Sequence, residues 1–410
     1  MAVEQGTNVA QLRERIREAI EREHDHLREV GESIRLNPEL GYEEYMAAQL
    51  LADHLREAGF EVEKPYKGVE TAFKATRRGM SDGPTVAILA EYDALKGIGH
   101  GCGHNLIGAS GLAVAIGMAS VLDETPGTVV IMGTPAEEGG GGKVKLLQEG
   151  GFDGIDAVLM IHHHGHESGS AVTWPDGTSL ATNGLTFEFH GKPAHAAADP
   201  ENGVNALNAI IQTFEGIDAL RQHITMDARI HGIITHGGDA VNVVPKYARC
   251  QFGIRAARSD YLDELIGKVR NIAEGAALMT GCELTVTGRQ FPYADKRPSY
   301  VLGRRFHEHM GAAGIDLSHA PSGRTMASTD LGNVSQVIPS VTGYFAISHE
   351  PIPGHSQEVL DASGSDYGYD QLVKVSTAMA WTTLDALLDP SLTQEAWNEH
   401  GKWQELYERS

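Results

Sequence analysis

The strongest constraint on the fold of this chain comes from three short apolar runs. Each run is followed directly by residues that can bind a metal or move a proton. The runs are 85–90 (TVAILA), 128–132 (TVVIM) and 158–161 (VLMI). Continuous apolar residues, many of them β-branched, are typical of strands buried on both faces of a sheet, and helical patterns lie between the runs. We therefore expect an α/β fold with a mostly parallel sheet. Ligands bind at the carboxyl ends of strands in such sheets, so the residues after each run are candidate site residues.

A change of pattern after residue 181 predicts an inserted domain. The chain there alternates as half-buried strands around two amphipathic helices, in the order strand, helix, strand, strand, helix, strand. This order is typical of the ferredoxin-like motif. We assign 182–294 to this inserted α+β domain, and 1–181 together with 295–410 to the domain that carries the candidate site. A length of 410 residues suits two or three domains of roughly 150 residues each.

Charge and cysteine content exclude several classes of protein. The chain carries 55 Asp and Glu against 33 Lys and Arg, a net charge of −22, so nucleic acid and anionic membranes are poor partners. The most apolar helical stretch, 108–122, is shorter than the roughly 20 residues of a membrane span, and we expect a buried helix there. We expect one amphipathic helix over the first 35 residues, and no signal peptide. Three scattered cysteines give no disulfide framework, which favours a soluble protein of the reducing cytoplasm.

A glycine-rich loop, 97–105 (GIGHGCGHN), contains the first candidate ligands. Glycines allow a tight backbone path that turns Cys102 and His104 toward one point, and thiolate with imidazole is a metal-binding pair. Phosphate binding is the alternative for a glycine-rich loop, but the spacing here breaks the G-x-G-x-x-G pattern. We interpret the loop as metal-binding.

Two adjacent glutamates, Glu137 and Glu138, follow the second apolar run in the segment TPAEEGGGG. An isolated Glu-Glu pair is usually a solvated surface feature, but its position at the end of a buried strand favours a functional role. One carboxylate can then bind a metal while its neighbour holds a water. Lys143 resembles a P-loop lysine only superficially, since Val144 replaces the Ser or Thr that would bind magnesium.

Histidines follow the third apolar run and occur again near the end of the chain. In the segment IHHHGH, His162 comes first after the strand and is the best candidate ligand, since alternate side chains of an extended chain face opposite sides. For His163, His164 and His166, a polar lining or surface role is as acceptable an interpretation as contact with a substrate. His355, in the loop segment GHSQE, would by itself more often be a surface residue.

Together these motifs give one thiol, three imidazoles and one carboxylate. The candidate ligands are Cys102, His104, Glu138, His162 and His355. Five protein ligands are too many for one catalytic ion with an open position, and they suit two divalent ions that share a bridging group and a water. Manganese or zinc fits this donor set, and cobalt or nickel is possible.

The same set suggests a mechanism of hydrolysis. Metal ions lower the pKa of a water and polarise a carbonyl group, and Glu137 would take the water proton and deliver it to the departing nitrogen. Asp93, which follows the first apolar run, would orient a histidine ligand. A metal-bound imidazole usually donates its other ring proton to such an acceptor.

In their order along the chain, these motifs resemble the M20 metallopeptidases. The matching segments are EYDALKGIGHGCGHNLIGASGLA, GTPAEEGGGG, GKPAHAAADPENGVNALNA, NVVP and STDLGNVSQVIPS, together with the strand-end His162. The likeness runs from residue 37 to residue 355 and is closest to the amidohydrolase branch that includes aminobenzoyl-glutamate hydrolases and related dipeptidases. It implies a di-metal catalytic domain of the aminopeptidase type, with the insertion 182–294 as a lid through which two or more copies associate.

The resemblance also implies roles for single residues. The five candidate ligands fall on the family's metal ligands, and Glu137 falls on its catalytic base. His195, in GKPAHAA, matches a histidine that reaches the active site of the partner subunit and stabilises the oxyanion. Asn242, in NVVP, matches a lid residue near the substrate.

Substrate binding and the reaction stay open to alternatives. Arg255 and Arg324 could hold a substrate carboxylate with paired hydrogen bonds, although a structural ion pair is the commoner role of an arginine. His163 departs from the aromatic residue or proline that the family often has at this point, and it could contact the substrate. The leading hypothesis is hydrolysis of an amide that links an acyl or aroyl group to an amino acid or small amine. Release of ammonia from an aromatic acid by the same site, and a binding protein without catalysis, are the alternatives.

Overall fold

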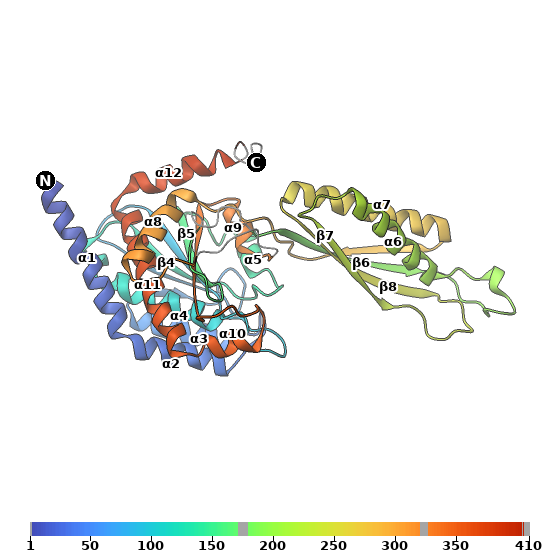
Figure 1. Ribbon diagram of the computed structural model, residues 1–410, viewed down its shortest axis with the longest axis horizontal. Coiled ribbons are helices and arrows are strands. Elements are labelled where there is room, and N and C mark those ends of the chain that lie inside the picture. Colours follow the sequence, from blue (N-terminus) through green and yellow to red (C-terminus); the bar gives the residue numbers. More distant parts are fainter. Residues whose placement is uncertain (1, 171–178, 320–326, 404, 406–410) are drawn as a thin grey trace. The chain divides into compact units, whose positions relative to one another are not determined.

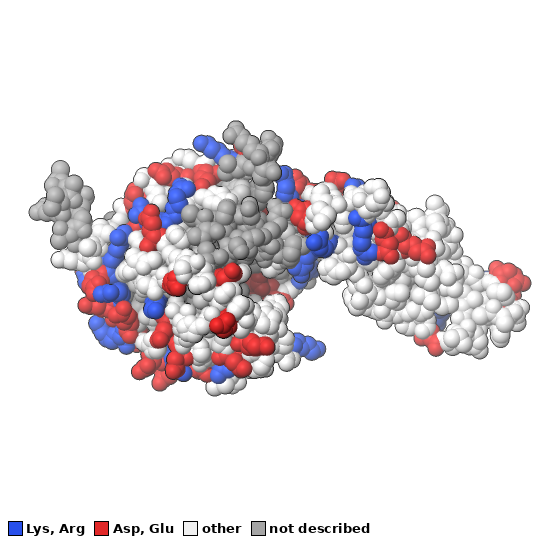
Figure 2. Space-filling view, in the orientation of Figure 1, with Lys and Arg blue, Asp and Glu red and all other residues white. Residues whose placement is uncertain are grey.

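The computed structural model describes residues 2–170, 179–319, 327–403 and 405, which form two compact units (Figure 1). The second unit is Ser179–Lys296 with a short later segment that ends at Gly332, and the rest of the chain forms the first unit. Each unit has its own sheet and its own hydrophobic core. On the face of the described chain in Figure 2, acidic and basic side chains are interspersed over the first unit.

The first unit is built on a six-stranded sheet in the order β1-β2-β4-β3-β5-β10. Its strands are β1 (Glu61–Glu63), β2 (Phe73–Arg78), β3 (Thr85–Ala90), β4 (Thr128–Gly133), β5 (Ala157–His163) and β10 (Ser340–Phe345). The pairings from β4 to β10 are parallel, and those of β1 and β2 are antiparallel. Nearly every residue of β3, β4 and β5 is buried, as expected for strands with no solvent-exposed face. The predicted α/β fold with a mostly parallel sheet is confirmed.

The helices that accompany this sheet include a central, closely packed α4. They are α1 (Ala2–Arg22), α2 (His24–Leu36), α3 (Tyr45–Glu57), α4 (His104–Ala119), α5 (Gly142–Gln148), α8 (Tyr300–Ala312), α9 (Leu331–Ser335), α10 (Gln357–Ala362), α11 (Asp366–Leu388), α12 (Pro390–His400) and the 3₁₀ turn Leu122–Glu124. A Cβ added at Gly111 would lie 3.0 Å from Ala90 Cβ, and one at Gly117 would lie 2.8 Å from Ile20 Cδ1. The expected buried helix is therefore confirmed. None of the helices in the described part of the chain combines the length and apolar character needed to cross a bilayer.

The N-terminal segment differs from its prediction. The prediction of one amphipathic helix over the first 35 residues is wrong in its continuity. The chain forms two helices there, α1 and α2, with a break at Glu23. The Glu23 N–H donates to the Ile20 carbonyl over 3.1 Å, a tightened turn that ends α1. Neither glycine nor proline marks the break, so no local signal predicts it. Both helices still bury apolar side chains in the core of the first unit.

The second unit is a four-stranded antiparallel sheet in the order β7-β8-β6-β9. Its elements are β6 (Ala181–His190), α6 (Ala206–Leu220), β7 (Arg229–His236), β8 (Tyr247–Ala256), α7 (Ser259–Thr280) and β9 (Glu283–Gly288), with 3₁₀ turns at Pro200–Asn202 and Arg221–His223. Burial alternates strictly along β8 because one face of the sheet packs against α6 and α7 (Figure 1). This is the ferredoxin-like order of elements that the sequence pattern predicts.

Candidate metal centre

The candidate residues of the first unit meet at the carboxyl ends of parallel strands. β3 leads into Asp93, and β4 leads into the turn that carries Glu137 and Glu138. His162 is the penultimate residue of β5, within the strand rather than after it as expected. Because β3 pairs in parallel with both β4 and β5, these ends share one edge of the sheet.

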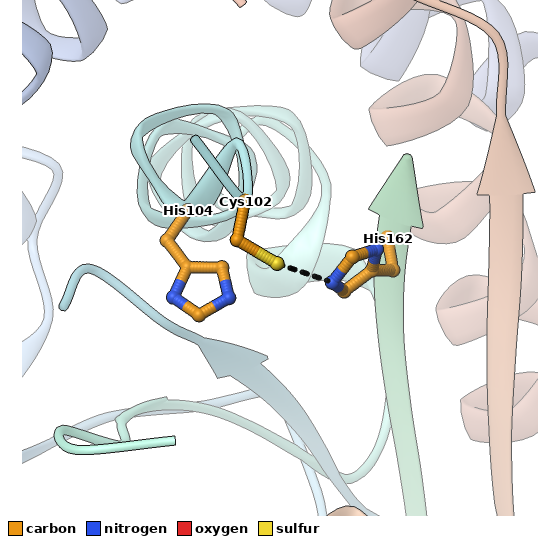
Figure 3. A group of neighbouring side chains, drawn as sticks. All are labelled: Cys102, His104 and His162. Carbon is orange, nitrogen blue, oxygen red and sulfur yellow. Dashed lines mark hydrogen bonds between the residues drawn. The ribbon is translucent and has the colours of Figure 1, made fainter. Parts of the chain in front are cut away.

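The turn before α4 presents Cys102 and His104 close together. Gly103 between them has a φ of 67°, the left-handed conformation that favours glycine, and a Cβ there would lie 2.7 Å from the ring of His163. Figure 3 shows Cys102 directed toward His162, whose Nε2 lies 3.7 Å from Cys102 Sγ, with His104 beside them. Burial raises the pKa of the Cys102 thiol, so a thiolate at this position needs a cation to stabilise it.

Hydrogen bonds leave the Nε2 atoms of two histidines for the cluster. His104 Nδ1 lies 2.9 Å from Asp93 Oδ1, and His162 Nδ1 lies 2.8 Å from the backbone oxygen of His163. In the neutral rings Nδ1–H donates in each pair, which places the lone pair on Nε2. Burial lowers the pKa of His162 to about 4, which favours its neutral ring. Both rings can bind a metal through Nε2. Burial alone would lower the pKa of His104, but Cys102 and Asp93 outweigh that effect and raise it, so a metal ion bound there would displace the Nε2 proton.

Asp93 connects two loops of the site. Besides its contact with His104, its Oδ2 accepts a hydrogen bond of 2.8 Å from the Glu138 N–H. Burial alone would raise the pKa of Asp93, but His104 and the Glu138 N–H outweigh that effect and hold the pKa below its ordinary value. These contacts are the ones that an orienting role for Asp93 requires.

The turn that carries the two glutamates is sharply bent. Ala136 has a φ of 58°, in the left-handed region that costs a non-glycine residue about 1–3 kcal/mol. Glu137 is buried, and Glu138 Oε1 lies 3.3 Å from the Nε2 of His355. His355 itself has a φ of 54°, so its side chain is also presented by a strained loop.

The donor atoms form one connected cluster. Among the sets of ligand atoms that lie within 4.8 Å of one another, three consist of the candidate residues: Cys102, His104 and His162; Cys102, Glu138 and His355; and His104, Glu137 and Glu138. Each set shares a residue with another set. The structure therefore brings together the five candidate ligands and Glu137.

The cluster has the chemistry that divalent cations require. His104 Nε2 and Glu138 Oε1 are buried, and each has one long contact with a group of the site: Glu91 Oε2 lies 3.5 Å from His104 Nε2, and His355 Nε2 lies 3.3 Å from Glu138 Oε1. Because an unsatisfied buried polar atom costs about 1–3 kcal/mol, a bound cation would stabilise both atoms better than these long contacts do. Thiolate, imidazole and carboxylate groups together suit ions such as zinc and manganese.

His195 and Asn242 lie in the second unit, on two paired loops, and both are exposed. The Ala196 N–H donates to the backbone oxygen of Asn242 over 3.0 Å. His195 Nδ1 accepts hydrogen bonds from the N–H groups of Ala197 and Ala198, at 3.2 and 3.1 Å. The proton of the neutral His195 ring is therefore on Nε2, which leaves Nε2–H as a donor.

The two arginines that could hold a substrate carboxylate have different positions. Arg255 is half-buried on β8, and its pKa is lowered by burial and by the nearby charge of Arg289. Arg324 lies outside the described residues.

The other histidines of the IHHHGH segment have separate surroundings. His163, the candidate substrate contact, is buried with its ring against Gly103, a position that supports the Cys102 loop from within. His164 Nδ1 lies 2.8 Å from a carboxylate oxygen of Glu167, a local contact within the segment. His166 is partly exposed. A contact of His163 with the substrate stays a prediction.

Sequence reasoning missed a buried ion pair beside the cluster. Lys143, set aside as a false P-loop lysine, is fully buried on α5, and its Nζ lies 2.6 Å from Glu91 Oε1. Glu91 Oε2 in turn lies 3.5 Å from His104 Nε2. The sequence signal for this ion pair was Glu91, an acidic residue directly after the buried strand β3. A carboxylate that is buried there requires a cationic partner.

Comparison with known proteins connects this chain to characterised relatives. A family model described as a peptidase dimerisation domain matches residues 182–280. The chain is 34% identical over 401 residues to the Xaa-Arg dipeptidase of Mus musculus, a match that covers 93% of this chain and 90% of the relative. It is 30% identical to one of the subunits of the p-aminobenzoyl-glutamate hydrolase of Escherichia coli, a match that covers 94% of each chain.

Solved structures share the fold. An aminobenzoyl-glutamate utilization protein from Klebsiella pneumoniae has a TM-score of 0.68 at 20% identity and covers 88% of this chain and 97% of its own. A dinuclear metal-binding M20 peptidase from Bacillus subtilis has a TM-score of 0.62 at 21% identity and covers 85% of this chain and 97% of its own. Sequence relatives and fold agree over nearly the whole length. The chain belongs to the M20 family of peptidases and amidohydrolases, enzymes that hydrolyse C–N bonds.

Proposed function

We propose that this protein is a di-metal hydrolase that cleaves an amide between an acyl or aroyl group and an amino acid or small amine. The observation that carries the proposal is the convergence of five metal-binding side chains around Glu137 at one edge of the sheet. The two relatives support the substrate class, because their names describe a dipeptidase and a hydrolase of an aroyl-amino acid. An amide to an amino acid is common to both.

Two divalent ions, manganese or zinc with cobalt or nickel as alternatives, would be held by the donor cluster. The residues that would hold them are Cys102, His104, Glu138, His162 and His355. When bound, such ions lower the pKa of a water and polarise the substrate carbonyl. Glu137 takes the water proton and transfers it to the departing nitrogen, and Asp93 keeps His104 in the tautomer that leaves Nε2 for the metal.

The second unit would complete the site through a partner copy. The match to a dimerisation domain supports a homodimer or higher homo-oligomer. His195 would donate its Nε2–H to the oxyanion in the partner's site, with Asn242 near the substrate. Arg255 and Arg324 would attract the carboxylate of the substrate.

A metal-replete activity screen tests the reaction. We expect release of an amine or amino acid from acyl-amino acids, dipeptides or aroyl-amino acids, and loss of about 10³-fold or more in kcat for Glu137→Gln with both metals retained. Ammonia released from an aminoaromatic acid would instead identify an aminohydrolase. No turnover on any of these substrates by the metal-loaded protein would favour a binding protein.

Subunit mixing tests whether His195 acts on the partner's site. Glu137→Gln and His195→Ala should each be nearly inactive as homodimers. A mixed dimer has one site with a native Glu137 and a native His195 from the other copy, so equal mixing should restore about a quarter of the wild-type rate. Absence of restored activity after proven subunit exchange would place His195 and Glu137 of one chain in the same site. An active His195→Ala homodimer would remove His195 from the mechanism.

A further inference from the structure

A buried glutamate outside the metal cluster contacts the backbone next to Glu137. Glu44 is fully buried, and its Oε1 accepts a hydrogen bond of 2.7 Å from the Ala136 N–H. Ala136 directly precedes Glu137 and has the positive φ that a non-glycine residue keeps only when its surroundings enforce it. Gly41 and Gly140 leave room for this conformation, since a Cβ at either position would lie within 3.0 Å of Ala136 atoms.

Glu44 does not stabilise the start of its own helix with its side chain, although its position would suit that role. Glu44 is the N-cap residue of α3, yet its side chain makes no capping hydrogen bond to that helix. Glu39 does this instead, because its two oxygens accept from the N–H groups of Met46 and Ala47 at 2.9 Å each. The Glu44 carboxyl is thus available to point inward, at the turn after β4.

Two carboxyl groups hold the backbone on either side of Glu137. Glu44 accepts from the residue before it, and Asp93 Oδ2 accepts from the Glu138 N–H after it at 2.8 Å. We propose that Glu44 is a positioning residue that, together with Asp93, fixes the Ala136–Glu138 turn so that the Glu137 carboxylate is aimed at the reacting water. This inference rests on the proposed role of Glu137 as the general base.

The positioning role depends on one property of the Glu44 side chain, its hydrogen-bond acceptor. The carboxyl group of Glu44 also lies beside the hydroxyl group of the buried Thr71. Burial and the charge of Asp93 raise the pKa of Glu44 to about 7, and Oε1 remains an acceptor in both protonation states. A glutamine should therefore replace it, whereas a side chain of the same length without an acceptor should not.

The test compares Glu44→Met, Glu44→Asp and Glu44→Gln in the full-length, metal-loaded protein. Met removes the acceptor and Asp withdraws it by one methylene, so we expect each to lower kcat by about 10²-fold, with KM and the two bound metals unchanged. Gln should retain kcat within about threefold. Glu43→Met, at the exposed neighbouring position, is the matched control and should leave kcat unchanged.

Hydrogen–deuterium exchange of the 134–142 segment gives a readout that does not depend on turnover. We expect faster exchange of the Ala136 and Glu138 amides in Glu44→Met and Glu44→Asp, and protection close to wild type in Glu44→Gln. The proposal is overturned if Met and Asp leave kcat within about threefold, or if kcat falls only in proportion to lost metal or lost folded protein. If the wild-type protein shows no turnover, the proposed reaction is contradicted. Faster exchange in Glu44→Met would still show, in that case, that Glu44 fixes the Ala136–Glu138 turn.

Discussion

The two units place their candidate residues in opposite environments. In the first unit, the residues come from strand ends and the start of α4 and are mostly buried, and carboxyl groups such as Asp93 fix their orientation. In the second unit, His195 and Asn242 lie on exposed paired loops, and the hydrogen bonds that the structure describes for them come from backbone N–H groups of those loops. The first arrangement is preorganised within one unit, whereas the second needs another surface to act on. Metal binding should therefore depend on the first unit alone, and turnover on both.

Metal removal should have the largest effect and should be specific to the first unit. A chelator is expected to abolish turnover and to lower the unfolding temperature of the first unit, since bound ions stabilise only the folded state. Manganese or zinc should restore both properties. Calorimetry with parallel activity assays measures the effect, and full activity after verified metal removal would break the comparison.

His195→Ala tests the other side of the comparison. It removes a donor to the oxyanion, so kcat should fall by about 10²–10³-fold while the bound metal stays at the wild-type level. Elemental analysis and steady-state kinetics on the same sample give both quantities. Loss of metal together with activity would mean that the second unit contributes to the metal centre after all.

Asp93→Asn changes the orientation of a ligand without removing one. An amide can no longer accept reliably from both the His104 ring and the Glu138 N–H, and metal affinity should fall by about 10–100-fold. Competition with a fluorescent chelator measures the affinity. Ala198→Pro, which removes one of the N–H donors to His195, is the matched change in the second unit and should leave metal affinity unchanged.

Asp385→Asn should have the smallest effect on the site and a measurable effect on the first unit's stability. Asp385 accepts from Arg13 and His309, and although burial alone would raise its pKa, these partners hold the pKa below its ordinary value. A depressed folded pKa stabilises the protein above the ordinary carboxyl range, and that stability is lost as pH falls through the folded pKa. We expect the variant to lose about 1–3 kcal/mol near neutral pH and the difference from wild type to shrink below about pH 4. Denaturant unfolding at several pH values, with kcat as control, checks this.

Local patterns predicted the parts of the fold that local chemistry determines. The runs that became β3, β4 and β5 are apolar along their whole length, and the glycines around Cys102 indicate a tight turn without reference to the rest of the chain. The convergence of the motifs was inferable because parallel strands align their carboxyl ends.

Contacts between distant segments were not predictable in this way. Glu44 lies 92 positions from Ala136, and nothing near Glu44 in the sequence indicates that its side chain turns away from α3. His309, which with His307 two positions away reads as a solvated helix residue, is instead buried against Asp385, 76 positions later. Such pairs form only when elements pack, so their signal lies in the tertiary structure.

Anomalous diffraction from crystals of the metal-loaded protein tests the central claim most directly. The account predicts two peaks per chain about 3.5–4 Å apart, with Cys102 and His355 among their ligands and Glu137 beside them without binding either ion. A single peak, or ions bound away from Cys102 and His355, would contradict it.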